Sequence, residues 1–184
     1  MTFSVCKLSD ISDEAKNSVF YKLSSSQKEY ILAKPKEKQE QSIAVRALLD
    51  KLLSKEGASA DVSCLMFDVD GRPQLDGRKD IFISLSHSDN MIACAVSKCP
   101  VGIDVQAVCK VSDKLVDRVC TPYEKEYIEQ NGAEAFIKIW TAKEAYKKAS
   151  GVNFAETVKD NIASKGELKS GKTDGYYWSV FELR

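Results

Sequence analysis

The sequence has neither an excess of charge of one sign nor an apolar run long enough to span a membrane. Its 184 residues include 27 basic and 27 acidic side chains, so the formal net charge is zero at pH 7. A neutral chain has no general attraction for duplex nucleic acid, so we expect neither a nucleic-acid nor a membrane partner. Any anionic ligand must be held by a local cluster of basic side chains.

Signals for zinc ligation, disulfide bridging and secretion are absent as well. The six cysteines include no Cys-x-x-Cys pair, and a chain of this length can bury a core without a disulfide framework. Met1–Lys7 lacks the basic start and the apolar core of a signal peptide. We therefore expect reduced, mostly buried cysteines and a cytoplasmic protein.

Apolar periodicity and capping signals predict alternating helices and strands. A capping box at Ser26–Glu29 predicts a short helix, and apolar spacing predicts a long helix over 36–56, ended by Gly57. The break at Lys98–Pro100 separates two halves of mixed content, which predicts an α+β fold with subdomains 1–98 and 99–184. Further strands are expected at 62–69, 81–86, 91–96, 101–105 and 176–183, and further helices from Ser112, from Thr121 and over 133–149.

Residues 140–148, WTAKEAYKK, place a carboxylate and an ammonium group one helical turn apart. Thr141, Glu144 and Lys148 share one narrow arc of the helix, whereas Trp140 lies on the apolar side that should face the core. The simplest interpretation of Glu144 and Lys148 is an exposed ion pair worth about 0.3–0.5 kcal/mol. Only neighbouring acidic and phosphate-binding residues would give this pair a chemical role.

Asp104 and Gln106 follow an apolar strand and should leave the sheet on the same face. Aspartate is unfavourable inside a strand, so Asp104 could be a cap or turn residue at a strand edge, outside the core. A Mg²⁺ site would explain it better, because that ion takes one or two carboxylates together with phosphates and water. Gln106 could supply a carbonyl oxygen or simply be a polar edge residue.

The single histidine, His87, lies between Ser86 and Ser88 after an alternating strand. A Ser-His-acid hydrolase is a poor match, because no nucleophile-elbow pattern is present. His87 could be a structural residue, or it could donate a ring N–H to phosphate with help from the Ser86 hydroxyl. Glu124 is expected to complete a capping box with Thr121.

Four segments in this order resemble the signature of the 4′-phosphopantetheinyl transferase superfamily: Gly71–Pro73, Ser84–Ser88, Val101–Asp104 and Trp140–Lys148. The half-chain that precedes the Gly-x-Asp segment resembles the longer, surfactin-synthetase-activating branch. That resemblance implies two similar small α/β subdomains that form a pseudo-dimer, with the active site at their interface. It also implies a monomer.

The resemblance implies Mg²⁺-dependent transfer of 4′-phosphopantetheine from coenzyme A to a serine of an apo acyl or peptidyl carrier protein. In the family's pattern Asp104 and Glu144 would hold Mg²⁺, with Gln106 as a third metal residue. Glu144, or a water on the metal, would take the proton of the attacking serine. Lys148 would contact phosphate and offset the charge on the leaving group.

The same resemblance assigns Arg72, Ser86, His87 and Lys148 to the phosphates of coenzyme A, with His87 also counted among the catalytic residues. Such a set of residues suits phosphoryl transfer, because positioning and charge stabilisation provide most of the catalysis of that reaction.

The sequence departs from the pattern at three points, and two of them, Gln106 and the short C-terminus, motivate a second hypothesis. Gln106 stands where the family usually has an acid, and Gln41 stands where a basic residue is expected, with Lys36, Lys38 and Arg46 as substitutes. The chain also stops soon after its last predicted strand. The protein could therefore be a binding module for coenzyme A or a carrier protein that has lost its activity. A metal-dependent phosphohydrolase would need more acids and histidines near these segments.

Overall fold

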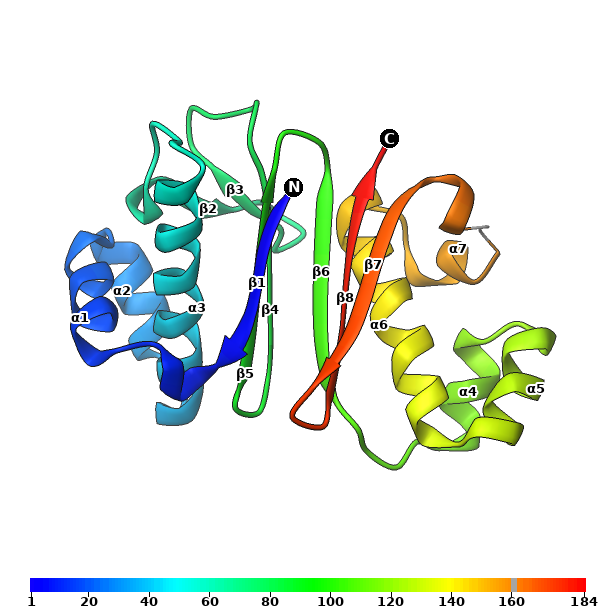
Figure 1. The fold of residues 1–184 in the computed structure, drawn as a ribbon. Coiled ribbons are helices and arrows are strands. Elements are labelled where there is room, and N and C mark those ends of the chain that lie inside the picture. Colours follow the sequence, from blue (N-terminus) through cyan, green and yellow to red (C-terminus); the bar gives the residue numbers. More distant parts are fainter. Residues whose placement is uncertain (160–161) are drawn as a thin grey trace.

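The computed structural model describes residues 1–159 and 162–184, and it has mixed α and β structure. Figure 1 shows a helix–sheet–sheet–helix arrangement, with two sheets side by side and helices on the outside of each. The strands are β1 (Thr2–Lys7), β2 (Leu65–Phe67), β3 (Pro73–Leu75), β4 (Phe82–Ser88), β5 (Met91–Ser97), β6 (Val101–Ala107), β7 (Gly166–Thr173) and β8 (Tyr176–Leu183). The helices are α1 (Asp13–Lys22), α2 (Ser25–Leu32), α3 (Lys36–Lys55), α4 (Asp113–Val119), α5 (Pro122–Asn131), α6 (Ala133–Ser150) and α7 (Phe154–Lys159), with short 3-10 helices at Leu8–Asp10, Val62–Cys64 and Ile162–Ser164.

The two three-stranded sheets have the same connectivity. Their strand orders are β1-β5-β4 and β6-β8-β7, and all pairs are antiparallel. In each sheet the strand that is last in the sequence lies in the centre, between the strand that is first in the sequence and the one that is second. A long helix, α3 or α6, lies between the first and middle strands in sequence. The short hairpin β2–β3 forms a separate sheet in the first half.

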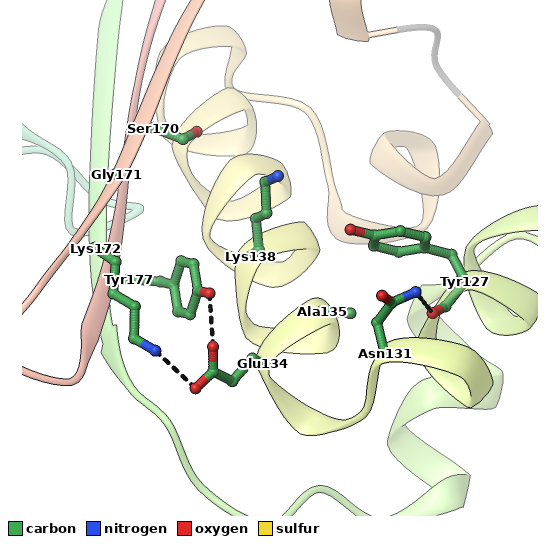
Figure 2. A pocket seen from close by; sticks show the side chains of 9 residues that line it. All are labelled: Tyr127, Asn131, Glu134, Ala135, Lys138, Ser170, Gly171, Lys172 and Tyr177. Atoms are coloured by element: carbon green, nitrogen blue, oxygen red, sulfur yellow. Dashed lines mark hydrogen bonds and ion pairs between the residues drawn. The ribbon is translucent and has the colours of Figure 1, made fainter.

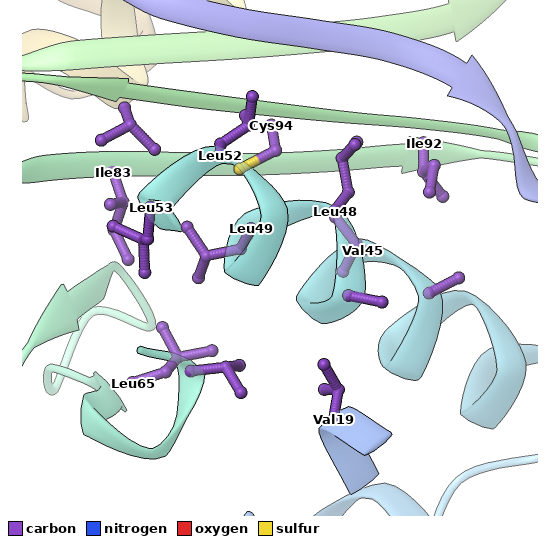
Figure 3. Close-up of a cluster of buried hydrophobic side chains, with 14 of the residues drawn as sticks. Val19, Val45, Leu48, Leu49, Leu52, Leu53, Leu65, Ile83, Ile92 and Cys94 are labelled. Carbon is purple, nitrogen blue, oxygen red and sulfur yellow. The ribbon is translucent and has the colours of Figure 1, made fainter. Parts of the chain in front are cut away.

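Strand β5 is buried on both faces, and alternation of its side chains explains why. Ile92 and Cys94 pack against α3 in the core of the first half, which includes Leu49 and Leu52 (Figure 3). Ala93 and Ala95 point the other way, into a second cluster that is shared with the second sheet. The two sheets therefore form a common apolar layer.

Strand β6 also uses both faces. Ile103 and Val105 enter the layer between the sheets, whereas Gly102 lies against the backbone of α6. Asp104 belongs to the same face as Gly102 and is only 3% exposed. The expectation that Asp104 lies at a strand edge outside the core was therefore wrong, because α6 covers this face of the sheet.

Serine hydroxyls join β4 of the first sheet to β6 of the second. Three hydroxyls of β4 accept hydrogen bonds from backbone N–H groups of β6: Ser84 from Ile103 at 3.0 Å, Ser86 from Val105 at 3.3 Å and Ser88 from Ala107 at 3.2 Å. These bonds satisfy the N–H groups of an edge strand and fix the register between the halves.

Most predicted elements are confirmed, with two corrections. The capping box of α2 is formed by Ser24 and Gln27, two residues before the predicted one, because the Ser24 hydroxyl accepts from the backbone of Gln27. The strand predicted over 62–69 begins as a 3-10 turn, and only Leu65–Phe67 is extended. The long helix α3, the strands β4, β5, β6 and β8, and helices α4 to α6 occur where the sequence predicts them.

Candidate active site

Asp104 is the point where three of the four motif segments meet. The Lys148 ammonium on α6 lies 2.8 Å from Asp104 Oδ1 and 2.8 Å from the carbonyl oxygen of Ile103. The Ser86 hydroxyl on β4 donates to the same carboxylate oxygen at 2.9 Å. The Gln106 amide lies 3.3 Å from Asp104 Oδ2. A buried carboxylate is tolerated here because it has a cation and hydrogen-bond donors around it.

Gly102 sets the distance between α6 and β6. A Cβ at this position would lie 2.7 Å from the Ala149 backbone nitrogen and 2.9 Å from Lys148 Cβ, and closer still to the Ala145 carbonyl oxygen. Only glycine allows the helix backbone to approach the strand this closely. This approach brings the Lys148 side chain onto Asp104, two residues further along β6.

Glu144 lies one turn before Lys148 on α6, and its side chain is 14% exposed. Both of its carboxylate oxygens lie 3.4 Å from Lys147 Nζ, which is a loose contact. The prediction for the apolar side of α6 is confirmed in part: Tyr146 is buried in one cluster, whereas Trp140 is only half-buried against another. Thr141 is also buried and shares a 3.0 Å hydrogen bond with Ser179 of β8.

A cleft of about 970 Å³ runs between the β2–β3 hairpin and the C-terminal part of α6. Arg72 from the hairpin lines it together with Glu144, Lys147 and Lys148. The Arg72 guanidinium donates to the carbonyl oxygen of Gly151 at 2.8 Å, so it also joins the first half to the end of α6. The cleft therefore brings basic groups of both halves beside the Asp104 contact.

His87 lies at the far end of β4 with an exposed side chain. Partial loss of water around the ring lowers its pKa from the ordinary 6.5, and the positive charges of Lys38, Lys34 and Lys148 lower it further. Three ammonium groups thus act on one imidazole. This is a region of positive potential, which suits an anion.

Gln41, which stands where a basic residue is expected, is 6% exposed and connects two parts of the first half. Its amide nitrogen donates to the carbonyl oxygen of Asp89 in the β4–β5 turn at 2.7 Å. Its amide oxygen accepts from Lys38 Nζ at 3.0 Å. Gln41 therefore positions a lysine beside His87. Arg46 differs from Lys38, because it is buried and lines a separate pocket.

The first lysine of the WTAKEAYKK segment has a role that the sequence reasoning did not identify. Lys143 is 3% exposed, and its ammonium donates to Glu124 at 2.6 Å and to the carbonyl oxygen of Val119 at 2.7 Å. Glu124 also forms the predicted capping box with Thr121. Lys143 thus fixes α5 against α6. Its place on a buried arc of the helix was the available signal.

The described residues contain no group of three or more His, Cys, Asp or Glu side chains that could hold a metal ion. Two carboxylates and an amide are nevertheless enough for Mg²⁺ when phosphate and water complete its shell. Among the described residues, Asp104 Oδ2 accepts only the long contact from Gln106, and the two oxygens of Glu144 accept only long contacts. A turn of the Gln106 amide would present its oxygen. The residues present therefore fit this ion.

A smaller pocket of about 370 Å³ lies between α5, α6 and β7 (Figure 2). Glu134 accepts from Lys172 at 2.7 Å and from the Tyr177 hydroxyl at 2.9 Å, and these bonds lower its pKa. None of the predicted site residues lines this pocket. In the part of the chain that the structure describes, no helix is both long and apolar enough to cross a bilayer.

The arrangement can hold a cation and phosphate oxygens, because it combines a buried acid, a second carboxylate and several basic groups around α6 and the adjoining strands. The family model for the 4′-phosphopantetheinyl transferase superfamily matches residues 100–176, which include β6 and α6. This match supports the resemblance to the superfamily, and two of the four predicted segments, Val101–Asp104 and Trp140–Lys148, lie within the matched residues.

Three curated relatives carry the name 4′-phosphopantetheinyl transferase. The protein gsp of Aneurinibacillus migulanus is 36% identical over 44% of this chain and 35% of its own length. HetI of Nostoc sp. is 32% identical over 61% of this chain and 52% of its own length. A Bacillus subtilis protein is 26% identical over 70% and 65%. The matches thus span about a third to two thirds of these relatives.

Proposed function

We propose that this protein transfers 4′-phosphopantetheine from coenzyme A to a serine of an apo carrier protein, in a Mg²⁺-dependent reaction. The observation that carries the proposal is the meeting of β4, β6 and α6 at the Asp104 carboxylate. The names of the three relatives and the match over 100–176 support it.

Asp104 and Glu144 would hold Mg²⁺, with the Gln106 amide oxygen as a third ligand. When bound, the ion would neutralise charge on the pyrophosphate of coenzyme A. Lys148 already pairs with Asp104. When Mg²⁺ and coenzyme A bind, at least one N–H of its ammonium group must therefore point toward a phosphate oxygen. Its contact with the Ile103 carbonyl would keep it close to the site.

The transfer needs no nucleophile from the enzyme. The hydroxyl oxygen of the carrier serine attacks the phosphorus next to pantetheine, and the bond from that phosphorus to the oxygen of the leaving 3′,5′-ADP breaks. Glu144 would take the serine proton. Lys148 offsets the charge that appears on the leaving group. The chain contributes positioning and fixed charge, which dominate catalysis of this class.

Arg72, His87 and Lys38 are proposed to hold the remaining phosphates of coenzyme A. Arg72 lines the cleft beside α6, and Lys38 adds positive charge near His87. Ser86 is less available for a phosphate than these three residues, because its hydroxyl already donates a hydrogen bond to Asp104. We assign Ser86 first to orienting Asp104, and a phosphate contact would require that bond to open.

We also propose that residues 1–98 and 99–184 are two subdomains of a monomeric pseudo-dimer with the site between them. The shared strand order supports this division, because no sheet contains strands from both ranges among the described residues. The six free thiols support a reducing, cytoplasmic location.

Incubation with coenzyme A, Mg²⁺ and a panel of apo carrier proteins tests the reaction, with the carriers weighed by intact mass spectrometry. A gain of one phosphopantetheine group, lost on chelation, is expected. No gain on any carrier, with coenzyme A still bound, would reject the transferase.

The second candidate is a non-catalytic module that binds coenzyme A or a carrier. The amide of Gln106 against Asp104 motivates it, since an acid there would strengthen metal binding. Glu144→Gln should abolish turnover in an enzyme and leave the binding of a module nearly unchanged. Glu126→Gln, at an exposed acid of α5, is the matched control.

A further inference from the structure

Arg46 is a buried cation that has no acidic partner within residues 1–159 and 162–184. Its residue is 3% exposed, and its Nη1 donates to the backbone oxygen and the hydroxyl of Ser42 at 2.8 and 2.7 Å. Its Nε is the one buried side-chain nitrogen or oxygen atom, among the described residues, that has no hydrogen-bond partner. No carboxylate of the described residues forms an ion pair with it. An uncompensated buried charge is costly, so this arrangement needs a reason.

The free edge of the guanidinium has the shape that a carboxylate fits. Nη1 is occupied by Ser42, whereas Nε and Nη2 form no hydrogen bond within the described part of the chain. These two nitrogens lie on one edge of the planar group and can donate two parallel hydrogen bonds. Burial also lowers the pKa of Arg46, in agreement with a cation that has lost its water.

Arg46 lines a pocket of about 740 Å³ that is separate from the Asp104 contact. Its walls combine apolar and polar side chains, and they come from α2, the 3-10 helix at Val62–Cys64 and the β2–β3 hairpin, with Arg46 from α3. Tyr30 is 57% exposed and Phe67 is 41% exposed, with ring centroids 6.5 Å apart, and the Arg46 guanidinium lies 5.5 Å from the Phe67 ring. Met66, at 47% exposed, adds to this surface. Exposed aromatic side chains around one desolvated cation are typical of a small-molecule site.

The acidic residues of the pocket do not neutralise Arg46. Asp68 accepts hydrogen bonds from the backbone nitrogens of Asp70 and Arg72 and from Gln74, so its carboxylate is held within its own loop. Asp76 lines the pocket without an ion pair to Arg46. These acids favour a ligand with a single negative charge over a polyphosphate, because further negative charge would meet repulsion.

We propose that this pocket binds a small organic acid, with its carboxylate on the Nε–Nη2 edge of Arg46 and its apolar body against Tyr30, Met66 and Phe67. The site is independent of the proposed transferase reaction. It has a volume within the range of small-molecule sites, and the ligand supplies the counter-charge that the described residues do not give Arg46.

Binding of 4-phenylbutyrate, followed by NMR on the full chain, tests the proposal. The acid should move the Arg46 Nε–H resonance, and the uncharged 4-phenylbutan-1-ol should bind about 10-fold or more weakly, because it forms no charged hydrogen bond. Arg46→Met should lose the preference for the acid. Lys28→Met, which removes a neighbouring cation of α2 outside the pocket, should keep it.

Equal binding of acid and alcohol, or an Arg46→Met affinity within about twofold of wild type, would overturn the proposal, since charge recognition predicts about tenfold. Absence of binding at millimolar 4-phenylbutyrate would overturn it too. If Arg46→Met does not fold, the Nε–H shift in the wild-type protein decides: no movement with the acid rejects the site, whereas movement with the acid and none with the alcohol supports it.

Discussion

The two halves share a strand order but attach their long helices to their sheets in different ways. In the first half, α3 contacts β5 through hydrocarbon, with Leu49 and Leu52 against Ile92 and Cys94. In the second half the backbone of α6 lies directly on β6 at Gly102. Polar side chains then connect helix to sheet, as Lys148 does with Asp104.

This difference means that the helix–sheet contacts of the first half mainly stabilise the fold, whereas those of the second half position the proposed site residues. Apolar contacts are non-directional, so they stabilise the first half without fixing any side chain to a particular oxygen atom. Charged hydrogen bonds depend on distance and angle, so the second half fixes the positions of Lys148 and Asp104. Damage to the apolar face of α3 should therefore lower stability, whereas damage to the polar contacts of α6 should lower turnover even in folded protein.

The largest combined effect is expected for Gly102→Ala. The new Cβ would push α6 away from β6, which should destabilise the protein by about 1–3 kcal/mol and misplace Lys148. Turnover of the folded protein should fall at least about 10-fold, since misplacement of a charged group by a fraction of an ångström loses its contribution. Urea unfolding and carrier-labelling rates measure the two effects.

Leu49→Ala is the comparison in the first half. Leu49 is fully buried, so its truncation should cost about 2–5 kcal/mol, yet the folded fraction should label carrier at the wild-type rate. If Leu49→Ala slowed the folded enzyme as much as Gly102→Ala, the contrast between the halves would be wrong.

Asp104→Asn is expected to have the next largest effect. It removes the counter-charge of Lys148, whose side chain is 29% exposed, and should cost about 1–3 kcal/mol of unfolding free energy. It should also raise the Mg²⁺ concentration that half-saturates labelling. Denaturant unfolding with a Mg²⁺ titration of the rate measures both.

Asp117→Asn is the matched control for that change. It breaks the Lys125–Asp117 pair, in which Asp117 is 68% exposed, and should cost at most about 1 kcal/mol. Equal losses of stability in the two variants would show that burial of Asp104 adds nothing to its ion pair.

The sequence predicted the framework well because helix caps and apolar periodicity are local signals. Thr121 and Glu124 form the expected box, and Gly57 ends α3. The approach at Gly102 could not be predicted, because it depends on a helix about 45 residues away in the chain. The same holds for Lys143 and Arg46, whose burial follows from tertiary packing and not from their own neighbours.

Lys148→Ala should lower turnover more than Lys147→Ala. Lys148 contacts Asp104 and Ile103, whereas Lys147 makes 3.4 Å contacts with Glu144 and lies over the Phe154 ring. We expect a loss of about 10-fold or more for the first and less than about threefold for the second, since one charged hydrogen bond is worth about 1.5–3 kcal/mol. Initial labelling rates at saturating coenzyme A measure this. Equal losses would mean that the assigned face of α6 is wrong.

The smallest effect is a titration, and the single histidine makes it unambiguous. The pKa of His87 should lie below 6.5, so the ring is neutral at pH 7 in the free protein. Below pH 6.5 the unfolded chain therefore binds more protons at this histidine than the folded chain does. The contribution of His87 to the free energy of unfolding is full above pH 6.5 and is lost as the pH falls through the folded pKa.

Lys38→Met should raise the pKa of His87 more than Lys34→Met, because Lys38 is the larger of these two causes. Lys36→Met is the control, and bound coenzyme A should raise the pKa by supplying negative charge. The ring Hε1 resonance followed by NMR against pH measures each value. A wild-type pKa of His87 at or above 6.5 would contradict the assignment of the basic cluster to the proposed coenzyme A site. Lys38, which is the residue of α3 assigned to that site, would then have no support there.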